Sequence, residues 1–328
     1  MKAIQVHQFG EPAVMQVADV EDLQPAAAQV VVQIQAAGVN PVDAYIRAGS
    51  YSRKPDLPYT PGIDGAGIVV AVGEGVTRWQ VGDRVYGGWP LSGTYAQQAR
   101  YSAEQVYPLP EQLSFAQGAA VFVPCSTAYR ALFDKGQAQP AETVLIHGAT
   151  GSVGLAAVQL AKSRGLTVIG TGGSATGRQL VVEQGADYVL DHHADDYLDQ
   201  VMEFTAGQGV AIIVEMLANV NLGHDLDILA LGGRVVIVGN RGTVEINPRA
   251  IMAKEATLTG LTLFNTSATA MSQIQAALQA SLQNGTLTPI VCQQLTLTEA
   301  AQAHEQVMLS GAQGKIVLLP NQPEQTWG

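Results

Sequence analysis

The chain has 328 residues, of which 47% are hydrophobic and 14% charged, and a chain of this length predicts two domains. Its two cysteines, Cys125 and Cys292, are far apart and have no C-x-x-C spacing, which favours a reducing compartment over a disulfide-bonded secreted scaffold. The net charge of −11 repels phosphate backbones, so nucleic acid is a poor candidate for the main partner.

The first residues do not have the pattern that is typical of a targeting signal. Its first ten residues, MKAIQVHQFG, lack the apolar core of a signal peptide and the Arg/Ser bias of a transit peptide. No uninterrupted apolar run approaches the ~18 residues that span a bilayer. We therefore expect a soluble, cytoplasmic protein with no membrane partner.

Residues 1 to about 122 have the pattern of a β-rich domain. Short runs of β-branched residues alternate with Pro61-Gly62, Gly87-Gly88 and similar pairs that are typical of turns. The runs that predict strands include 30–34, 67–72 and 83–85.

From about Thr143 the pattern changes to alternating strands and helices. This alternation implies crossover connections and a parallel sheet. Gly165 and Gly185 stand where helices should end. The predicted strands are 143–147, 166–170, 188–190, 210–215 and 234–239, and the predicted helices are 155–162, 178–184 and 195–204.

The C-terminal part returns to a different pattern. A long Ala/Gln-rich helix is predicted at 267–282, followed by a strand, a helix and a final strand at 315–319. We therefore predict an α/β protein in which a nucleotide-type domain, residues 125–264, is inserted between the two parts of another domain, residues 1–124 and 265–328.

A glycine-rich turn joins the first predicted strand of the nucleotide-type domain to its helix. In the sequence TVLIHGATGSVGLAA, Gly148, Gly151 and Gly154 permit a tight turn, close approach of a pyrophosphate and close helix packing. The helix N-terminus adds N–H groups and partial positive charge. The spacing is G-x-x-G-x-x-G instead of G-x-G-x-x-G, and an ordinary turn is the alternative. The order strand, turn, helix favours a dinucleotide site.

The end of the second strand indicates which dinucleotide is bound. An NAD site places an acidic residue there for the ribose 2′-hydroxyl, but the strand ends in Gly172-Gly173-Ser174 and no carboxylate appears before Glu183. This leaves room for a 2′-phosphate, and Arg178 and His192 are candidates to bind it, although each alone is more often a solvated surface residue. NADPH is the predicted cofactor.

The chain closely resembles the zeta-crystallin-like NADPH:quinone oxidoreductases of the medium-chain dehydrogenase/reductase superfamily. The matching stretches run from end to end and include GVNPVDAYIRAGSYSRKPDLPYTPG, GDRV, STAYRAL, HGATGSVGLAA, EMLANVNL, GGRVVIVGNRGTVEINPR and MAKE. The resemblance implies a GroES-like, β-rich catalytic domain formed by both chain ends and a Rossmann domain with a doubly wound parallel sheet, with the active site in the cleft between them.

The resemblance also assigns residues to the NADPH site. Two positions depart from the family pattern: His193 stands where zeta-crystallins usually have Arg, which lowers the charge near the 2′-phosphate, and Asn240 replaces a common Ser, which we expect to be neutral. The residues that match the family's cofactor contacts are Thr127, Thr150, Gly151, Ser152, Val153, Gly173, His192, Asn221, Val238, Gly239, Asn240, Arg241, Leu261, Thr262 and Leu263.

The residues that hold catalytic zinc in alcohol dehydrogenases of this superfamily are replaced. The family's Cys and His ligands correspond to Asn40 and Ile63, and neither an amide nor a sec-butyl group is a usual zinc ligand. Cys125 lies near the third ligand's segment but out of register, and a small buried residue is the favoured interpretation. We therefore expect no metal.

Without a metal, the substrate must already be poised for reduction, as a quinone or similar conjugated carbonyl is. Negative charge then develops on oxygen, where hydrogen-bond donors stabilise it. Asn40, Tyr45 and Tyr51 are candidate donors, Asp43 could orient them and Tyr59 could line the site. The alternative is structural: the tyrosines could pack within a loop, and Asp43 could cap a short helix.

Two alternative functions are compatible with parts of the sequence, and an oligomeric assembly is also expected. Reduction of the C=C bond of α,β-unsaturated aldehydes or ketones needs nearly the same chemistry, whereas an RNA-binding or structural crystallin-type role is disfavoured by the acidic charge and the lack of a Lys/Arg run. The resemblance implies a homodimer or homotetramer. Residues 257–264 predict an edge strand, through which we expect a homodimer to form.

Overall fold

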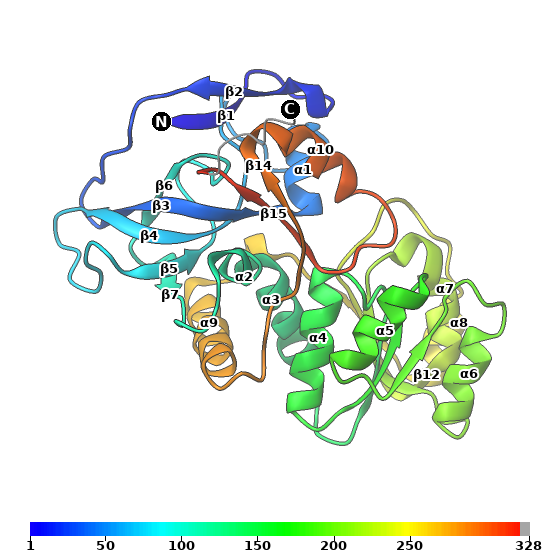
Figure 1. The fold of residues 1–328 in the computed structure, drawn as a ribbon. Helices are drawn as coiled ribbons and strands as arrows, with labels where there is room; N and C mark the ends of the chain where they lie inside the picture. The colour runs from blue at the N-terminus through cyan, green and yellow to red at the C-terminus, as the bar shows by residue number, and fades with distance from the viewer. Residues whose placement is uncertain (322–328) are drawn as a thin grey trace. The chain divides into compact units, whose positions relative to one another are not determined.

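The computed structural model describes residues 1–321, which pack into two units (Figure 1). Unit 1 contains Met1–Val123, Pro289–Ser310 and the C-terminal stretch from Lys315, and unit 2 contains Pro124–Thr288 and Gly311–Gly314. The predicted division differs from this grouping for residues 265–288, which pack with unit 2. The reason is visible in the helix α9 (Ala268–Gln283), whose buried Gln275 donates a hydrogen bond to Ser126 of unit 2 at 2.8 Å.

Unit 1 is β-rich, as its turn-punctuated sequence predicts. Its main sheet has the strand order β14-β15-β3-β4-β5-β7, with β6 pairing to β3, and β1 pairs with β2 in a separate ribbon. All of these pairs are antiparallel except β14 with β15. The strands are β1 (Lys2–Val6), β2 (Met15–Asp19), β3 (Gln29–Gly38), β4 (Asp64–Val72), β5 (Arg84–Gly87), β6 (Gln98–Ser102), β7 (Val106–Pro108), β14 (Val291–Thr296) and β15 (Lys315–Leu319).

Short helices complete unit 1, and its apolar side chains form one core. Ile34, Val69, Val85 and Leu318 belong to that core and are at most 1% exposed. The helical segments are η1 (Pro12–Val14), α1 (Pro41–Arg47), α2 (Phe115–Gly118), η4 (Leu297–Glu299) and α10 (Ala300–Gln306).

Unit 2 is built on a parallel sheet of six strands in the order β10-β9-β8-β11-β12-β13. From β8 the chain moves outward through β9 to β10, and then returns to the other side of β8 for β11, β12 and β13. Because such crossovers are right-handed, the helices of the two halves cover opposite faces of the sheet. The strand order therefore reverses between β8 and β11, where ligands of doubly wound sheets usually bind.

The strands of unit 2 lie close to the predicted ranges, and β13 is the edge strand that the sequence predicts. It ends earlier than expected, at Gly260, and Leu263–Asn265 form a 3₁₀ turn, η3. The strands are β8 (Thr143–Ile146), β9 (Thr167–Thr171), β10 (Tyr188–Leu190), β11 (Val210–Glu215), β12 (Leu229–Ile237) and β13 (Thr257–Gly260).

The predicted helices of unit 2 are present, but the sequence did not predict α7 or α8. The helical segments are α3 (Phe122–Tyr129), the π-helical turn η2 (Arg130–Lys135), α4 (Ser152–Ser163), α5 (Ala175–Glu183), α6 (Tyr197–Phe204), α7 (Ala218–Ile228), α8 (Pro248–Lys254) and α9. Within residues 1–321, no helix has both the length and the apolar character needed to cross a bilayer.

Candidate functional site

The glycine-rich turn lies between β8 and α4, at the point where the strand order reverses. Gly148 has a φ of +56°, a left-handed conformation that favours glycine. A Cβ on Gly154 would lie 2.6 Å from the Ala149 backbone, so this glycine allows α4 to pack closely on the turn. A Cβ on Gly151 would meet nothing closer than 3.6 Å, so this part of the backbone can be approached. The three glycines thus have the geometry that the sequence predicts.

The first turn of α4 can receive an anion. The first N–H groups of a helix have no partner within the helix, and the N-cap residue, Gly151, has no side chain to cap them. Ser152 and Val153 belong to this first turn. The backbone N–H of Gly314 donates to the Thr150 carbonyl at 2.9 Å and fixes the turn from the other side. The residues present therefore fit the pyrophosphate of a dinucleotide.

The end of β9 presents glycines and two imidazoles. A Cβ on Gly173 would lie 2.7 Å from Nε2 of His193 and 3.0 Å from Nε2 of His192, so both rings border this residue. Burial, followed by the charge of the neighbouring His193, lowers the pKa of His192. The structure therefore brings together Gly173 and His192, as predicted, and adds His193, which was noticed in the sequence only as a missing arginine.

Arg178 and Ser174 have local structural partners in this region. Arg178 donates to the Gly172 carbonyl at 3.1 Å and forms an ion pair with Asp191 at 2.7 Å. The Ser174 hydroxyl accepts from the Gly177 N–H at 3.1 Å and caps α5. Asp191, which sequence reasoning missed, partly balances the charge that Arg178 brings to the end of β9.

The remaining predicted cofactor residues of unit 2 follow the same edge of the sheet. The N–H groups of Val238 and Gly239 donate to the Glu215 carbonyl at 2.8 and 3.2 Å, and the Leu261 N–H donates to Ile237 at 3.1 Å. Arg130 donates to the Thr262 carbonyl at 2.6 Å. The other members are Thr127, buried in α3, Asn221 in α7, Leu263 in η3, and Asn240 and Arg241, which follow β12.

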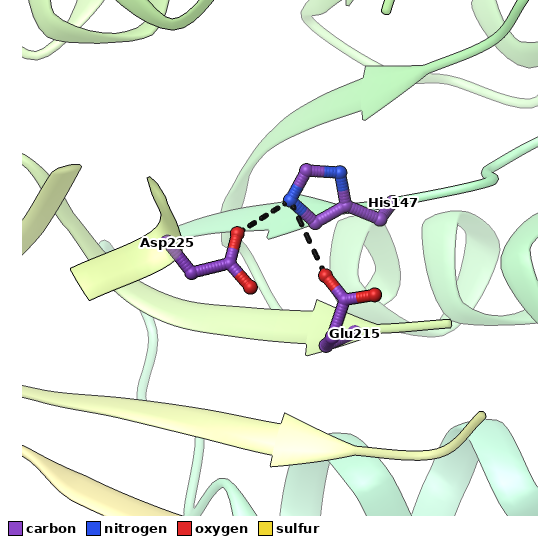
Figure 2. A group of neighbouring side chains, drawn as sticks. All are labelled: His147, Glu215 and Asp225. Atoms are coloured by element: carbon purple, nitrogen blue, oxygen red, sulfur yellow. Dashed lines mark hydrogen bonds and ion pairs between the residues drawn. The ribbon is translucent and has the colours of Figure 1, made fainter. Parts of the chain in front are cut away.

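Beside the glycine-rich turn lies a buried group of three ionisable side chains, His147, Glu215 and Asp225 (Figure 2). Nε2 of His147 is 2.8 Å from Oδ1 of Asp225 and 3.6 Å from Oε2 of Glu215. The side chains are 3% exposed for His147 and at most 1% for the two acids. Sequence reasoning missed this triad, because α7, which carries Asp225, was not predicted.

Burial and charge shift the pKa values of two members of the triad, Glu215 and His147. Burial raises the pKa of Glu215 to about 7, while the charge of His147 opposes the rise. Burial also lowers the pKa of His147, but the hydrogen bond with Asp225 and the two carboxylate charges outweigh it, so the pKa of His147 is raised overall. Both shifts favour the protonated forms of Glu215 and His147.

Unit 1 contains a second buried polar cluster, which joins Asn40, Asp43, Asp64 and Lys315. Nζ of Lys315 donates to Oδ2 of Asp64 at 2.8 Å and to Oδ1 of Asn40. The Asn40 amide nitrogen donates to Asp64 at 3.0 Å and to Asp43 at 3.2 Å. All four residues are at most 3% exposed. The Asn40 amide, which was predicted to donate to substrate, thus donates to two carboxylates within this cluster.

Asp43 has the helix-capping position that was the structural alternative for it. Its Oδ2 accepts from the Asn40 backbone N–H at 3.0 Å at the start of α1. Burial and the charge of Asp64 raise the pKa of Asp43 to about 7, against the opposing charge of Lys315. Asp64 and Lys315 were missed in the sequence, although a lysine heading the apolar strand KIVLL was a signal for a buried cation.

The three predicted tyrosines lie on and after α1. Tyr45 is on α1 and Tyr51 in the loop that follows it, and both are partly buried. Tyr59 pairs with Val6 through backbone hydrogen bonds, and its buried Oη has no hydrogen-bond partner among residues 1–321. Burial, followed by the charge of Asp43, raises the pKa of Tyr59. The structure therefore places Tyr59 near Asp43.

Asn40 and Ile63 occupy the two positions that correspond to zinc ligands in alcohol dehydrogenases. Asn40 accepts a hydrogen bond from an ammonium, and Ile63 is a buried apolar residue, 7% exposed. Cys125 is buried in α3 and Cys292 is exposed. An amide bound to a cation and a sec-butyl group do not fit a zinc site.

Two protein families match the chain, one within each unit. The family described as "Alcohol dehydrogenase GroES-like domain" matches residues 26–111, and "Zinc-binding dehydrogenase" matches residues 152–281. The human quinone oxidoreductase is 47% identical over 321 residues, which cover 97% of this chain and 98% of the human protein.

Two solved structures are similar over almost the whole chain. The Escherichia coli quinone oxidoreductase complexed with NADPH has a TM-score of 0.89 at 31% identity and covers 98% of this chain and 100% of its own. An NAD-dependent alcohol dehydrogenase has a TM-score of 0.91 at 28% identity, with the same coverage of both chains.

A GroES-like unit and a Rossmann unit with this strand order define a medium-chain dehydrogenase/reductase. Within that superfamily, the chain belongs to the quinone oxidoreductase family.

Proposed function

We propose that the protein is an NADPH-dependent quinone reductase that works without zinc. The observation that carries the proposal is the glycine-rich turn at the reversal of strand order, followed by a second strand that ends in glycine beside two imidazoles. The identity of 47% with the human quinone oxidoreductase supports the substrate class. The bound NADPH of the Escherichia coli structure supports the cofactor.

The residues of unit 2 would hold the nucleotide in three places. The turn from Gly148 to Val153 receives the pyrophosphate through backbone N–H groups. Gly173, His192 and His193 surround the 2′-phosphate, where the imidazoles donate hydrogen bonds. Asn221 and residues 238–241 and 261–263 follow the rest of the nucleotide along the carboxyl edge of the sheet. When bound, NADPH supplies the hydride for the reduction.

Unit 1 would supply the groups that stabilise the negative charge developing on the substrate oxygen. Phenols donate hydrogen bonds without ionising at neutral pH, which suits Tyr45 and Tyr51 to this role. Asn40 and Asp43 act indirectly, because their polar atoms hold the start of α1 in place. A quinone needs no metal to polarise it, which agrees with a lysine ammonium at Asn40 where zinc-dependent relatives have a metal ligand.

Steady-state assays with NADPH and NADH against ortho-quinones, para-quinones and conjugated enals test the proposal. We expect the highest kcat/KM for NADPH with a quinone. Faster reduction of enals would replace the proposed substrate with the C=C bond of a conjugated carbonyl, and equal use of NADH would contradict the proposed cofactor.

Tyr51→Phe tests the phenol directly. Loss of one hydrogen bond to developing charge should lower kcat with a quinone about tenfold, while thermal unfolding stays unchanged. Tyr188→Phe is the matched control, because Tyr188 is 39% exposed and stacks on Phe204 in unit 2. Unchanged kinetics in Tyr51→Phe would remove this residue from the mechanism.

We also propose a homodimer formed through β13. This strand ends the sheet of unit 2 and presents backbone groups that the same strand of a second copy could pair with. Sedimentation at micromolar concentration should give a dimer, and a monomer would contradict the proposal.

A further inference from the structure

The His147–Glu215–Asp225 triad lies where the strand order of unit 2 reverses. His147 directly follows β8 and directly precedes Gly148, the first glycine of the turn. Glu215 is the last residue of the neighbouring strand β11. Asp225 belongs to α7, the helix that follows β11. The three side chains therefore connect the glycine-rich turn to α7.

Hydrogen bonds continue from the triad to a proposed nucleotide contact. Oε1 of Glu215 accepts from Nδ2 of Asn221 at 3.1 Å and from the Leu217 N–H at the start of α7. Its other oxygen faces the His147 ring at 3.6 Å. One carboxylate thus contacts both the ring beside the glycine-rich turn and the amide of Asn221.

The charges of the triad are costly unless they are balanced. Two carboxylates and one imidazole are buried, and Oε2 of Glu215 and Oδ2 of Asp225 have no hydrogen-bond partner within residues 1–321. A buried charge is tolerated only when it is paired, and here a protonated imidazole is the nearest cation. Loss of the imidazole proton would therefore leave the two carboxylates without their cation and weaken the contacts that join His147, Glu215 and Asp225.

We propose that Glu215 and Asp225 are positioning residues, which through His147 and Asn221 hold the glycine-rich turn and the start of α7 in the geometry that accepts the nicotinamide nucleotide. This inference rests on the proposed function. It predicts that nucleotide affinity depends on a proton held in the triad and not on direct contact between either carboxylate and the nucleotide.

Other ionisable groups near the triad must be separated from it in the test. Tyr197 of α6 lies with its ring centroid 6.5 Å from that of His147, and its own pKa is raised to about 12, first by burial and then by the charge of Asp225. His192 is influenced by the charge of His147 and stands beside the 2′-phosphate region. Protonation of His192 should change the affinity for NADPH but not for NADH. Protonation of the triad should change the affinity for both nucleotides equally.

Asp225→Asn keeps the shape of the side chain and removes its charge. The dissociation constants of NADPH and NADH, measured by calorimetry from pH 5.5 to 9, should both rise about tenfold, the value of one charged hydrogen bond. The pH above which binding weakens should fall by about one unit for both nucleotides, because the imidazole loses the partner that keeps it protonated.

Two further variants separate positioning from folding. Glu215→Gln retains an oxygen for Leu217 and Asn221 but removes the second carboxylate charge beside His147, so the pH above which both nucleotides bind more weakly should fall, as in Asp225→Asn. Asp187→Asn is the control, because Asp187 pairs with Lys162 at 2.8 Å and accepts from Val168 near the start of β9, at the opposite edge of the sheet. It should change neither the affinity nor the pH profile.

The outcomes distinguish this inference from the proposed function. If the unmodified protein binds neither nucleotide, the proposed function fails. If it binds NADPH and Asp225→Asn has the same affinity and pH profile, or loses only stability in urea, the positioning role fails. A stoichiometric divalent metal in the purified protein that is lost in Asp225→Asn would also overturn it, because the triad would then be a metal site.

Discussion

Each unit contains a buried cluster of two carboxylates and one cation, and the two clusters differ in the cation. Unit 1 places the lysine ammonium of Lys315 among Asn40, Asp43 and Asp64. Unit 2 places the imidazole of His147 between Glu215 and Asp225. Imidazole is the one side chain whose ordinary pKa lies near physiological pH.

This difference lies in the cation and not in the acids. In both clusters burial raises the pKa of one carboxyl group, Asp43 or Glu215, to about 7. Only in unit 2 is the cation an imidazole, whose ordinary pKa lies near neutral pH. We infer that a change of pH acts on a carboxyl group in the unit 1 cluster, but on both a carboxyl group and the cation in the unit 2 triad.

The largest predicted effect breaks the ion pair of unit 1. Lys315→Met leaves Asp64 buried without its cation, which should lower the free energy of unfolding by about 3–5 kcal/mol. Urea unfolding followed by tryptophan fluorescence measures it, because Trp79 and Trp89 both lie in unit 1. Lys162→Met, which breaks a half-exposed pair, should cost less than about 1 kcal/mol. Equal losses in the two variants would contradict the role given to Lys315.

The next prediction concerns Asp43, the second carboxyl group in the unit 1 cluster, which contains only the one cation of Lys315. The folded-state pKa of Asp43 is raised from 3.8 to about 7, so the folded protein binds the proton more tightly than the unfolded chain. Its contribution to stability is fully present below pH 3.8 and is lost as the pH rises to about 7.

Asp43→Asn should remove this slope. Between pH 5 and 7.5 the variant should lose less free energy of unfolding than the unmodified protein, by an amount on the order of 1 kcal/mol or more. Urea unfolding at the two pH values measures the difference. Parallel losses in both proteins would show that Asp43 does not titrate in this range.

A smaller effect is expected at His193, one of the two imidazoles beside Gly173 in unit 2. His193→Arg places a cation that stays charged at every working pH beside Gly173. NADPH should then bind about fivefold tighter at pH 8, in line with one exposed charge pair, while NADH binding stays the same. Calorimetry with both nucleotides measures the change. An equal gain for NADH would place the 2′-phosphate elsewhere.

The smallest effect is expected outside both clusters. Asn240 is exposed and donates to the Gly242 carbonyl at 2.6 Å. Asn240→Ser should change NADPH affinity and stability by less than about 0.5 kcal/mol, as is usual for exposed positions. A larger loss of NADPH affinity would give the amide a direct role in binding.

Local sequence patterns predicted most of the fold. The apolar runs before and after the glycine-rich turn gave β8 and β9, and α4 begins at Ser152 close to its predicted start. Helix α7 was missed because its sequence ANVNLGHDLDI has no clear apolar periodicity, and its N-cap, Leu217, has no capping side chain.

The site was predicted only where a motif is local. The glycines of the turn share one segment, so their roles could be inferred. Asp225 is 78 residues from His147, and Lys315 is 251 residues from Asp64, so neither partner has a local signal. The hydrogen bonds of Asn40 within the polar cluster also involve Asp64 and Lys315, which are distant in the sequence, so no local pattern could indicate them.

Calorimetric titration of the purified protein with NADPH and then NADH tests the central claim most directly. The account predicts that NADPH binds to the glycine-rich turn of unit 2 and binds more tightly than NADH. A dissociation constant for NADH below that for NADPH, or no detectable binding of either nucleotide, would contradict it.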